Sequence, residues 1–194
     1  MAERHVRGYA LLGTTSFVEG RYDAPTRERI RDGLPPHVRA TATSGYKRVE
    51  WYPIEHFSAF LRGIALAHEA EGEPAMIDAL AACGSHIAEE ASNTFLKLFM
   101  RVLTPTLFAK KLPSVWSRDH DFGAVVSDVT RVHENILLLR VEDVEGYDFI
   151  GPLSIGYFRF VIGAMGKKNL NVDMKGWSFD APGPRAIDYT LTWT

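Results

Sequence analysis

The sequence predicts an α+β fold, in which an N-terminal helical layer packs on a C-terminal antiparallel sheet of about four strands. Two observations predict this class. Up to about residue 116, apolar residues recur every three or four positions, as they do along one face of a helix. From about residue 124 the period changes, and residues 186–193 alternate strictly between apolar and polar side chains. Such alternation is typical of a strand that packs one face and exposes the other.

Short elements are predicted at the start of the chain. Residues 5–12 are mostly apolar and predict an opening strand. Residues 14–32, interrupted by a glycine and a proline, predict two short helices. Residues 41–47 are rich in Thr, Ser and Gly and predict a polar connector. We expect residues 51–53 to open a helix that runs to about residue 70.

The clearest predicted element is a long helix over residues 74–102. Its apolar side chains recur every three or four residues and form one continuous stripe. Thr104-Pro105 ends this helix, and residues 107–116 predict the next one. The stripe of the long helix contains Met76, Leu80, Cys83, Ile87, Ala91, Phe95, Leu98 and Val102.

The predicted sheet comes from two hairpins separated by a helix. Residues 124–129 and 136–141 predict two strands joined by a polar turn. A helix follows over residues 149–165, and residues 170–179 and 186–193 predict the closing hairpin. In the helix, Gly156 and Gly163 are seven residues apart and so lie on one face, which we expect to approach the sheet closely.

Length and charge limit the classes of function. The chain has 194 residues, and we expect residues 1–194 to form a single ligand-binding-like domain. Its net charge is −2 with no run of like charges, so we expect no nucleic-acid partner. We expect no membrane span and a cytoplasmic location, because no segment is long and apolar enough for a bilayer or a secretory signal. Cys83 is the only cysteine, which excludes an internal disulfide and a thiolate zinc cage.

The specific catalytic motifs are missing from the sequence, so we expect a binding protein and no enzyme. There is no glycine-rich phosphate loop, no Gly-x-Ser-x-Gly turn and no His-Glu-x-x-His helix. The spacing of the seven histidines predicts no metal site, because His37, His120 and His133 fall in different predicted loops. The segment Arg118-Asp119-His120-Asp121 is interpreted as a solvated loop at a helix end. We therefore predict no catalytic residues, no metal and no cofactor.

Four side chains are candidates for a ligand pocket. His86 lies one residue off the apolar stripe of the long helix, where it can face a cavity. Phe95, Trp116 and Phe158 lie on apolar helix faces, where aromatic side chains fill a core and in some proteins line a pocket. A satisfied edge histidine and three core aromatics remain the alternative interpretation.

The order of the predicted elements is similar to that of a known superfamily. It joins haem–nitric-oxide-binding domains, vinyl-reductase-type small-molecule-binding domains and the Bet3-like subunits of TRAPP tethering complexes. Within it, the chain resembles a bacterial domain family of uncharacterised role that is related to the haem–nitric-oxide sensors. The residues that carry this resemblance are Val6-Arg7-Gly8, Ala10-Leu11-Leu12, Trp51-Tyr52-Pro53, residues 95–101, residues 104–108, Leu112, Trp116-Ser117 and Trp193.

The resemblance implies a domain that binds a ligand between helices and sheet, or that docks onto a protein. In the haem-binding branch a histidine near the end of the helix at residues 108–116 holds the iron, and this sequence has Trp116 there. Indole cannot ligate iron. The Tyr-x-Ser-x-Arg motif that binds the haem propionates in that branch is absent too. His120 would need a register shift to substitute, so haem is not expected.

Two functions follow from these interpretations. The first is a haem-free sensor or small-molecule-binding domain, with an apolar cavity between the helices and the sheet that takes a small apolar ligand. The alternative is a TRAPP-like protein-interaction module, an adaptor or homodimer, whose partner is another protein.

Overall fold

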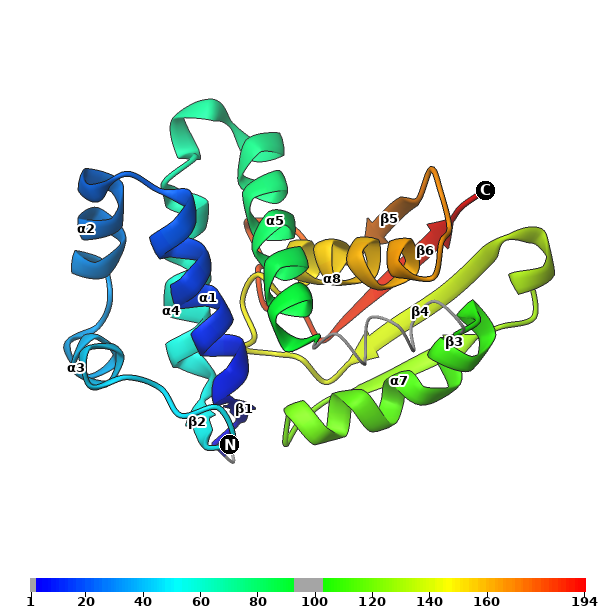
Figure 1. The fold of residues 1–194 in the computed structure, drawn as a ribbon, viewed down its shortest axis with the longest axis horizontal. Coiled ribbons are helices and arrows are strands. Elements are labelled where there is room, and N and C mark those ends of the chain that lie inside the picture. The colour runs from blue at the N-terminus through cyan, green and yellow to red at the C-terminus, as the bar shows by residue number, and fades with distance from the viewer. Residues whose placement is uncertain (1–2, 93–102) are drawn as a thin grey trace.

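The computed structural model describes residues 3–92 and 103–194, in which seven α-helices and six strands form a helical part, a two-stranded sheet and a four-stranded sheet (Figure 1). The helices are α1 (Gly8–Arg21), α2 (Ala24–Asp32), α3 (Pro36–Ser44), α4 (Ile54–Leu66), α5 (Glu73–Ala91), α7 (Pro105–Asp119) and α8 (Ile150–Ala164). The strands are β1 (His5–Arg7), β2 (Trp51–Pro53), β3 (Ala124–Asp128), β4 (Ile136–Glu142), β5 (Asn171–Lys175) and β6 (Ala186–Thr192). The predicted α+β class is confirmed.

The four C-terminal strands form one antiparallel sheet in the order β3-β4-β6-β5. The central strand β6 pairs with β4 on one side and β5 on the other, and Tyr189 lies opposite both Leu139 and Met174. Ile187, Tyr189 and Leu191 are buried and the residues between them are more exposed. The alternation predicted for this strand is therefore confirmed, and it directs one face of the sheet toward the helices.

The helices α5 and α8 connect the two parts of the structure. In Figure 1, α1, α2 and α4 lie on one side of α5, and α8 and the four-stranded sheet lie on its other side. Helix α5 packs on α1, α4 and α8, and α7 packs along the edge strand β3. Cys83 of α5 is fully buried, as expected for a small apolar residue on this helix.

Two glycines allow α5 and α8 to pack backbone against backbone. A Cβ atom on Gly156 of α8 would overlap the carbonyl oxygen of Ala81 and lie 2.8 Å from the nitrogen of Ser85. A Cβ atom on Gly84 of α5 would overlap the carbonyl oxygen of Leu153. The Ser85 hydroxyl donates a hydrogen bond of 2.8 Å to the Gly156 carbonyl, which fixes the two helices in register.

This contact corrects the predicted role of the two glycines in α8. Gly156 approaches α5 and not the sheet, whereas a Cβ atom on Gly163 would meet no heavy atom within 4 Å. Seven residues correspond to almost two helical turns, so the two positions share a face, but the crossing helix covers only one of them.

The N-terminal strand is shorter than predicted because Gly8 begins helix α1. Strand β1 pairs antiparallel with β2, with Val6 opposite Tyr52. Residues 51–53 therefore form a strand, and the helix predicted to open there begins at Ile54. A Cβ atom on Gly8 would overlap the carbonyl oxygen of Lys47 and contact the Tyr52 ring. The change from strand to helix thus occurs where only glycine fits.

The polar segment 41–47, predicted as a connector, is helical up to Ser44. The hydroxyls of Thr41, Thr43 and Ser44 donate to the carbonyl oxygens four residues earlier in the helix. These bonds satisfy the hydroxyl groups within the helix and make the polar segment compatible with it.

The long helix predicted over residues 74–102 ends at Ala91 in the described part of the chain. Ser92 has extended backbone angles, and its hydroxyl donates to the Ala88 carbonyl. The remainder of the prediction, with Phe95, falls on residues 93–102, outside the described residues. Within residues 3–92 and 103–194, none of the helices combines the length and the apolar character needed to cross a bilayer.

Candidate ligand-binding cavity

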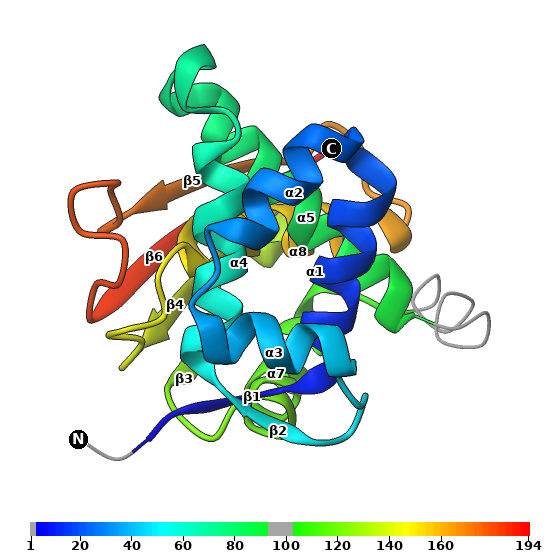
Figure 2. The same ribbon diagram turned by 90° about the vertical axis from the view of Figure 1, so that its left-hand side faces the viewer.

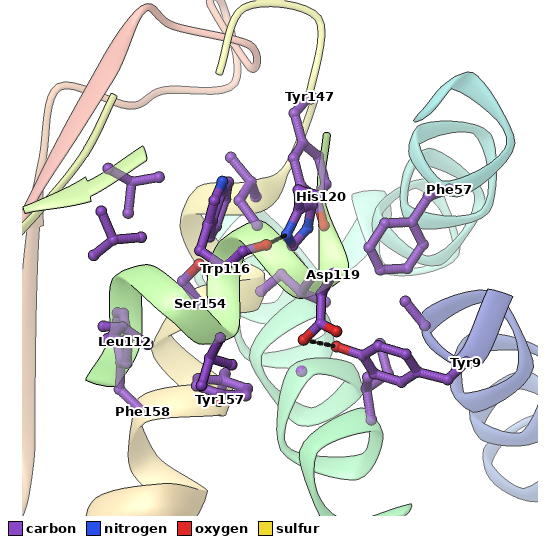
Figure 3. Close-up of a pocket in the computed structure, with 18 residues that line it drawn as sticks. Tyr9, Phe57, Leu112, Trp116, Asp119, His120, Tyr147, Ser154, Tyr157 and Phe158 are labelled. Atoms are coloured by element: carbon purple, nitrogen blue, oxygen red, sulfur yellow. Dashed lines mark hydrogen bonds between the residues drawn. The ribbon is translucent and has the colours of Figure 1, made fainter. Parts of the chain in front are cut away.

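A cavity of about 90 Å³ lies where α1, α5, α7 and α8 meet the sheet (Figure 3). Its walls are almost entirely apolar. The polar groups on them belong to Tyr9, Asp119, His120 and Ser154, together with two further tyrosines. The lining residues are Tyr9, Ala10, Phe57, Gly84, Ile87, Leu112, Val115, Trp116, Asp119, His120, Val125, Val141, Tyr147, Ile150, Leu153, Ser154, Tyr157 and Phe158.

Trp116 is the largest side chain that α7 contributes to this wall. It is 9 % exposed, and its Nε1 donates a hydrogen bond of 2.7 Å to the carbonyl oxygen of Phe122. The indole stacks on the His120 ring with centroids 4.0 Å apart and planes inclined by 17° (Figure 3). The indole is thus held by a hydrogen bond and a stacked ring while another part of its surface faces the cavity.

His120 follows directly after α7 and is enclosed by aromatic rings. Its Nδ1 donates a weak hydrogen bond of 3.3 Å to the Trp116 carbonyl, and the rings of Phe122 and Tyr147 lie within 6 Å of it. Burial lowers the pKa of His120 to about 4, against the opposing effect of the Asp119 and Asp121 carboxylates. The imidazole is therefore neutral at pH 7. Its Nε2 has no hydrogen-bond partner among the described residues and keeps a free lone pair.

A buried carboxylate forms the polar end of the cavity. Asp119 is 4 % exposed and accepts hydrogen bonds from the Tyr9 hydroxyl at 2.9 Å and from two nitrogens of Arg118 at 2.8 Å. Burial, and next the Asp119 charge, raise the pKa of Tyr9 well above its usual value, so its hydroxyl keeps its proton. Arg118 is largely exposed and supplies the positive charge that a buried carboxylate requires.

The structure brings together two of the four predicted pocket residues. Trp116 and Phe158 both line the cavity. Phe95 lies outside the described residues. His86 lies away from the cavity, between α1 and α5, where its Nε2 is 3.1 Å from the Ser16 hydroxyl and its ring contacts Phe17. His86 is therefore a hydrogen-bonded histidine at the edge of the core. Its position one residue off the apolar stripe directs its side chain toward α1 and away from the cavity.

Sequence reasoning missed the polar end of the cavity. The interpretation of residues 118–121 as a solvated loop is wrong for Asp119 and His120, since Asp119 is a buried helical residue and His120 lines the cavity. Tyr9 comes from the opposite end of the chain. One signal was present: Asp119 lies three residues after Trp116 and seven after Leu112, which is the spacing of the buried face of α7.

Comparisons with known proteins find similarity in structure and none in sequence. No protein-family profile and no curated protein sequence matches the chain. The Fe(II) unliganded H-NOX protein from K. algicida superposes with a TM-score of 0.71 at 10 % identity, covering 97 % of this chain and 96 % of that one. An H-NOX protein from S. oneidensis in the Fe(II)NO ligation state gives 0.68 at 10 % identity, with 97 % and 99 % covered. The NMR structure of the S. oneidensis H-NOX domain in the Fe(II)CO state gives 0.65.

This chain has the H-NOX fold. The relation to haem–nitric-oxide-binding domains inferred from the order of elements is thereby confirmed at the level of the fold. At about 10 % identity, the H-NOX fold itself carries no information on ligand or chemistry.

The cavity of this H-NOX fold does not fit a haem. Among the described lining residues there is no lysine or arginine to pair with the two propionates. The volume of about 90 Å³ is smaller than the roughly 150 Å³ that accommodates benzene, whereas a porphyrin is several times larger than benzene. His120 is the only histidine among the described lining residues, and it is stacked flat on Trp116. A haem would have to displace the indole and find other partners for its propionates.

We expect acid to destabilise the protein through His120. The pKa of about 4 in the fold lies below the ordinary value of 6.5, so the unfolded chain takes up a proton first as the pH falls. The contribution of neutral His120 to the free energy of unfolding is complete above pH 6.5. It decreases by up to about 3 kcal/mol as the pH falls from 6.5 to 4. Urea unfolding of the wild type and of His120→Phe across this range measures it.

His120→Phe keeps an aromatic ring against Trp116 and removes the titration. Its free energy of unfolding should therefore fall less steeply with acid than that of the wild type. Equal slopes for the two proteins would show that His120 is protonated as easily in the fold as in the unfolded chain. Other groups whose pKa burial also shifts, such as His56, are present in both proteins. Their effect cancels when the two pH dependences of the free energy of unfolding are subtracted.

Proposed function

We propose that this chain is a haem-free sensor or small-molecule-binding domain whose ligand occupies the cavity between the helices and the sheet. The observation that carries the proposal is the cavity itself, an apolar space lined by side chains from α1, α5, α7, α8 and the sheet. An apolar cavity large enough for a small molecule costs stability when it is empty, and a ligand that fills it regains that free energy.

The lining indicates the chemical class of the ligand. Apolar side chains surround most of the volume, so the body of the ligand is apolar and smaller than benzene. The free lone pair of neutral His120 is a hydrogen-bond acceptor, and the Ser154 hydroxyl also lines the cavity. A small apolar molecule with one hydrogen-bond donor suits both.

We expect the protein to be colourless. Trp116 occupies the position where the resemblance places an iron ligand, and the cavity, as the described residues line it, has neither the room nor the cations for haem. Protein produced with haem supplied should show no Soret band after purification. A stoichiometric Soret band that disappears in His120→Ala would contradict this and would make His120 the iron ligand.

Ligand titration tests the cavity directly. Furan and pyrrole are five-membered rings smaller than benzene, and of the two only pyrrole carries a hydrogen-bond donor. We expect saturable binding of both, monitored by ¹⁵N chemical-shift changes of residues on α7 and α8, with pyrrole the tighter ligand because it donates to His120. Native mass spectrometry of freshly purified protein would add the mass of any ligand retained from the cell.

A cavity-filling variant is the matched control. Ala10 is 5 % exposed and lines the cavity, so Ala10→Leu should occupy part of the space and abolish binding while the protein stays folded. Binding that persists unchanged in folded Ala10→Leu would place the ligand elsewhere and overturn the proposal.

Other expectations stay predictions. They are the absence of catalysis, the cytoplasmic location and the alternative function as a protein-interaction module or homodimer. Sedimentation of the pure protein measures the oligomeric state, and the same native mass spectra distinguish a dimer from a liganded monomer.

A further inference from the structure

Three potential metal ligands meet at the start of α4, and none of them lines the cavity. His37 projects from α3, and Glu55 and His56 come from the first turn of α4, beside which α3 lies (Figure 2). One ligand atom from each lies within 4.8 Å of the others. The Nε2 of His37 is 2.7 Å from a carboxylate oxygen of Glu55, and the two imidazole rings have centroids 5.6 Å apart.

His56 is held in place as a metal-binding histidine would be. It is 5 % exposed, and its Nδ1 is 3.2 Å from the Tyr46 hydroxyl. This contact fixes the ring and leaves Nε2 without a hydrogen-bond partner among the described residues. Metal-binding histidines characteristically have a hydrogen-bond partner on the other ring nitrogen, which sets the tautomer and the ring orientation. Burial, and next the neighbouring His37, lower the pKa of His56, so its ring is in the neutral form that metals bind.

We propose that His37, Glu55 and His56 bind one zinc ion, with water as the fourth ligand. Two imidazoles and one carboxylate are a donor set that proteins use for zinc, and imidazole disfavours magnesium and calcium. The carboxylate compensates part of the charge of the ion. This site is independent of the function proposed for the cavity.

Small side-chain movements are sufficient to form the site. Ligand atoms around tetrahedral zinc are about 3.4 Å apart when the bonds are about 2.1 Å long. The His37–Glu55 pair must open from 2.7 Å, and the widest separation must close from at most 4.8 Å. The side chains of His37 and Glu55 are 58 % and 62 % exposed, so they can move toward the fixed His56.

The zinc ion would act as a clamp on α3. This helix buries only Val38 and is otherwise exposed or half-buried. A zinc ion bound by His37 of α3 and by Glu55 and His56 of α4 would link the first turn of α3 to the better-packed helix α4. Binding therefore stabilises the fold without being required for it, because the core lies elsewhere.

Isothermal titration of the metal-free protein with zinc chloride tests this proposal. We expect one saturable site, and a loss of affinity of at least tenfold in His37→Ala and in Glu55→Gln. Both side chains are exposed, so these variants should fold even if His56→Ala does not. Zinc should raise the melting temperature of the wild type and not that of His37→Ala. Cobalt should give the visible absorption of a four-coordinate ion.

His133→Ala is the matched control. His133 is 75 % exposed and lies beside Glu134, so it presents an ordinary surface histidine and carboxylate outside the cluster. Its removal should leave the titration unchanged. Absence of a saturable site, or a site whose affinity is the same in wild type, His37→Ala and Glu55→Gln, would overturn the proposal and leave a hydrogen-bonded His–Glu pair.

Discussion

Replacing Gly156 by alanine is expected to lower the free energy of unfolding by more than about 3 kcal/mol, at or beyond the upper end of overpacking effects. The new methyl group would occupy the position of the Ala81 carbonyl oxygen. Because that atom is backbone inside α5, no side-chain rotation relieves the overlap, and the helices have to separate. Separation would also break the Ser85–Gly156 hydrogen bond and remove side chains of both helices from contact.

Gly163→Ala is the matched control on the same helix. A Cβ atom there meets no heavy atom within 4 Å, so alanine should stabilise the helix by about 0.5–1 kcal/mol. Gly84→Ala should resemble Gly156→Ala, since its methyl group would overlap the Leu153 carbonyl. Urea unfolding of the three variants gives the comparison. Similar stabilities of Gly156→Ala and Gly163→Ala would disprove the close backbone contact.

Trp116→Ala is expected to cost about 3–5 kcal/mol and to enlarge the cavity. The truncation removes the stacking on His120 and leaves the Phe122 carbonyl without its indole donor. The enlarged space should bind apolar molecules larger than benzene. Denaturant unfolding measures the loss of stability. Binding to the enlarged cavity is measured with a dye that fluoresces in apolar surroundings, such as anilinonaphthalene sulfonate.

Trp116→Phe separates packing from hydrogen bonding. The phenyl ring can still stack on His120 but cannot donate to Phe122, so we expect a loss of about 1–2 kcal/mol and no dye binding. If Trp116→Ala were destabilised without binding any dye, the surrounding side chains would have collapsed into the space. Trp116 would then be an ordinary core residue, and the cavity would lose its main wall.

The elements that the sequence predicts well are those with a local cause. The alternation in β6 and the apolar stripe of α7 both follow from burial of one face, which is visible in the order of residues. The strand pair β1–β2 has no such signal, because its register joins Val6 to Tyr52 across the whole of α1, α2 and α3. Residues 41–44 were predicted as a connector because residues with hydroxyl side chains favour turns. In the structure these hydroxyls donate to carbonyl oxygens of the preceding helical turn, and the segment is helical.

The candidate site divides in the same way. Trp116 and Phe158 could be selected as pocket candidates because aromatic residues on apolar helix faces point inward. Asp119 and His120 could not, since polar residues at a helix end are normally solvated, and Asp119 is paired with Tyr9, more than a hundred residues earlier. The cluster of His37, Glu55 and His56 likewise results from α3 folding back beside α4, which no spacing in the sequence shows.

The backbone contact between α5 and α8 has a consequence for how such domains can diverge. Gly84 and Leu153 belong both to that contact and to the wall of the cavity. Substitutions on this side of the cavity are therefore restricted by the close packing of the two helices. The opposite side is built from side chains such as Leu112 and Trp116, which substitution can enlarge, shrink or make polar without moving a backbone. Ligand preference in relatives of this chain should therefore evolve on α7, while α5 and α8 accept almost no change where they cross.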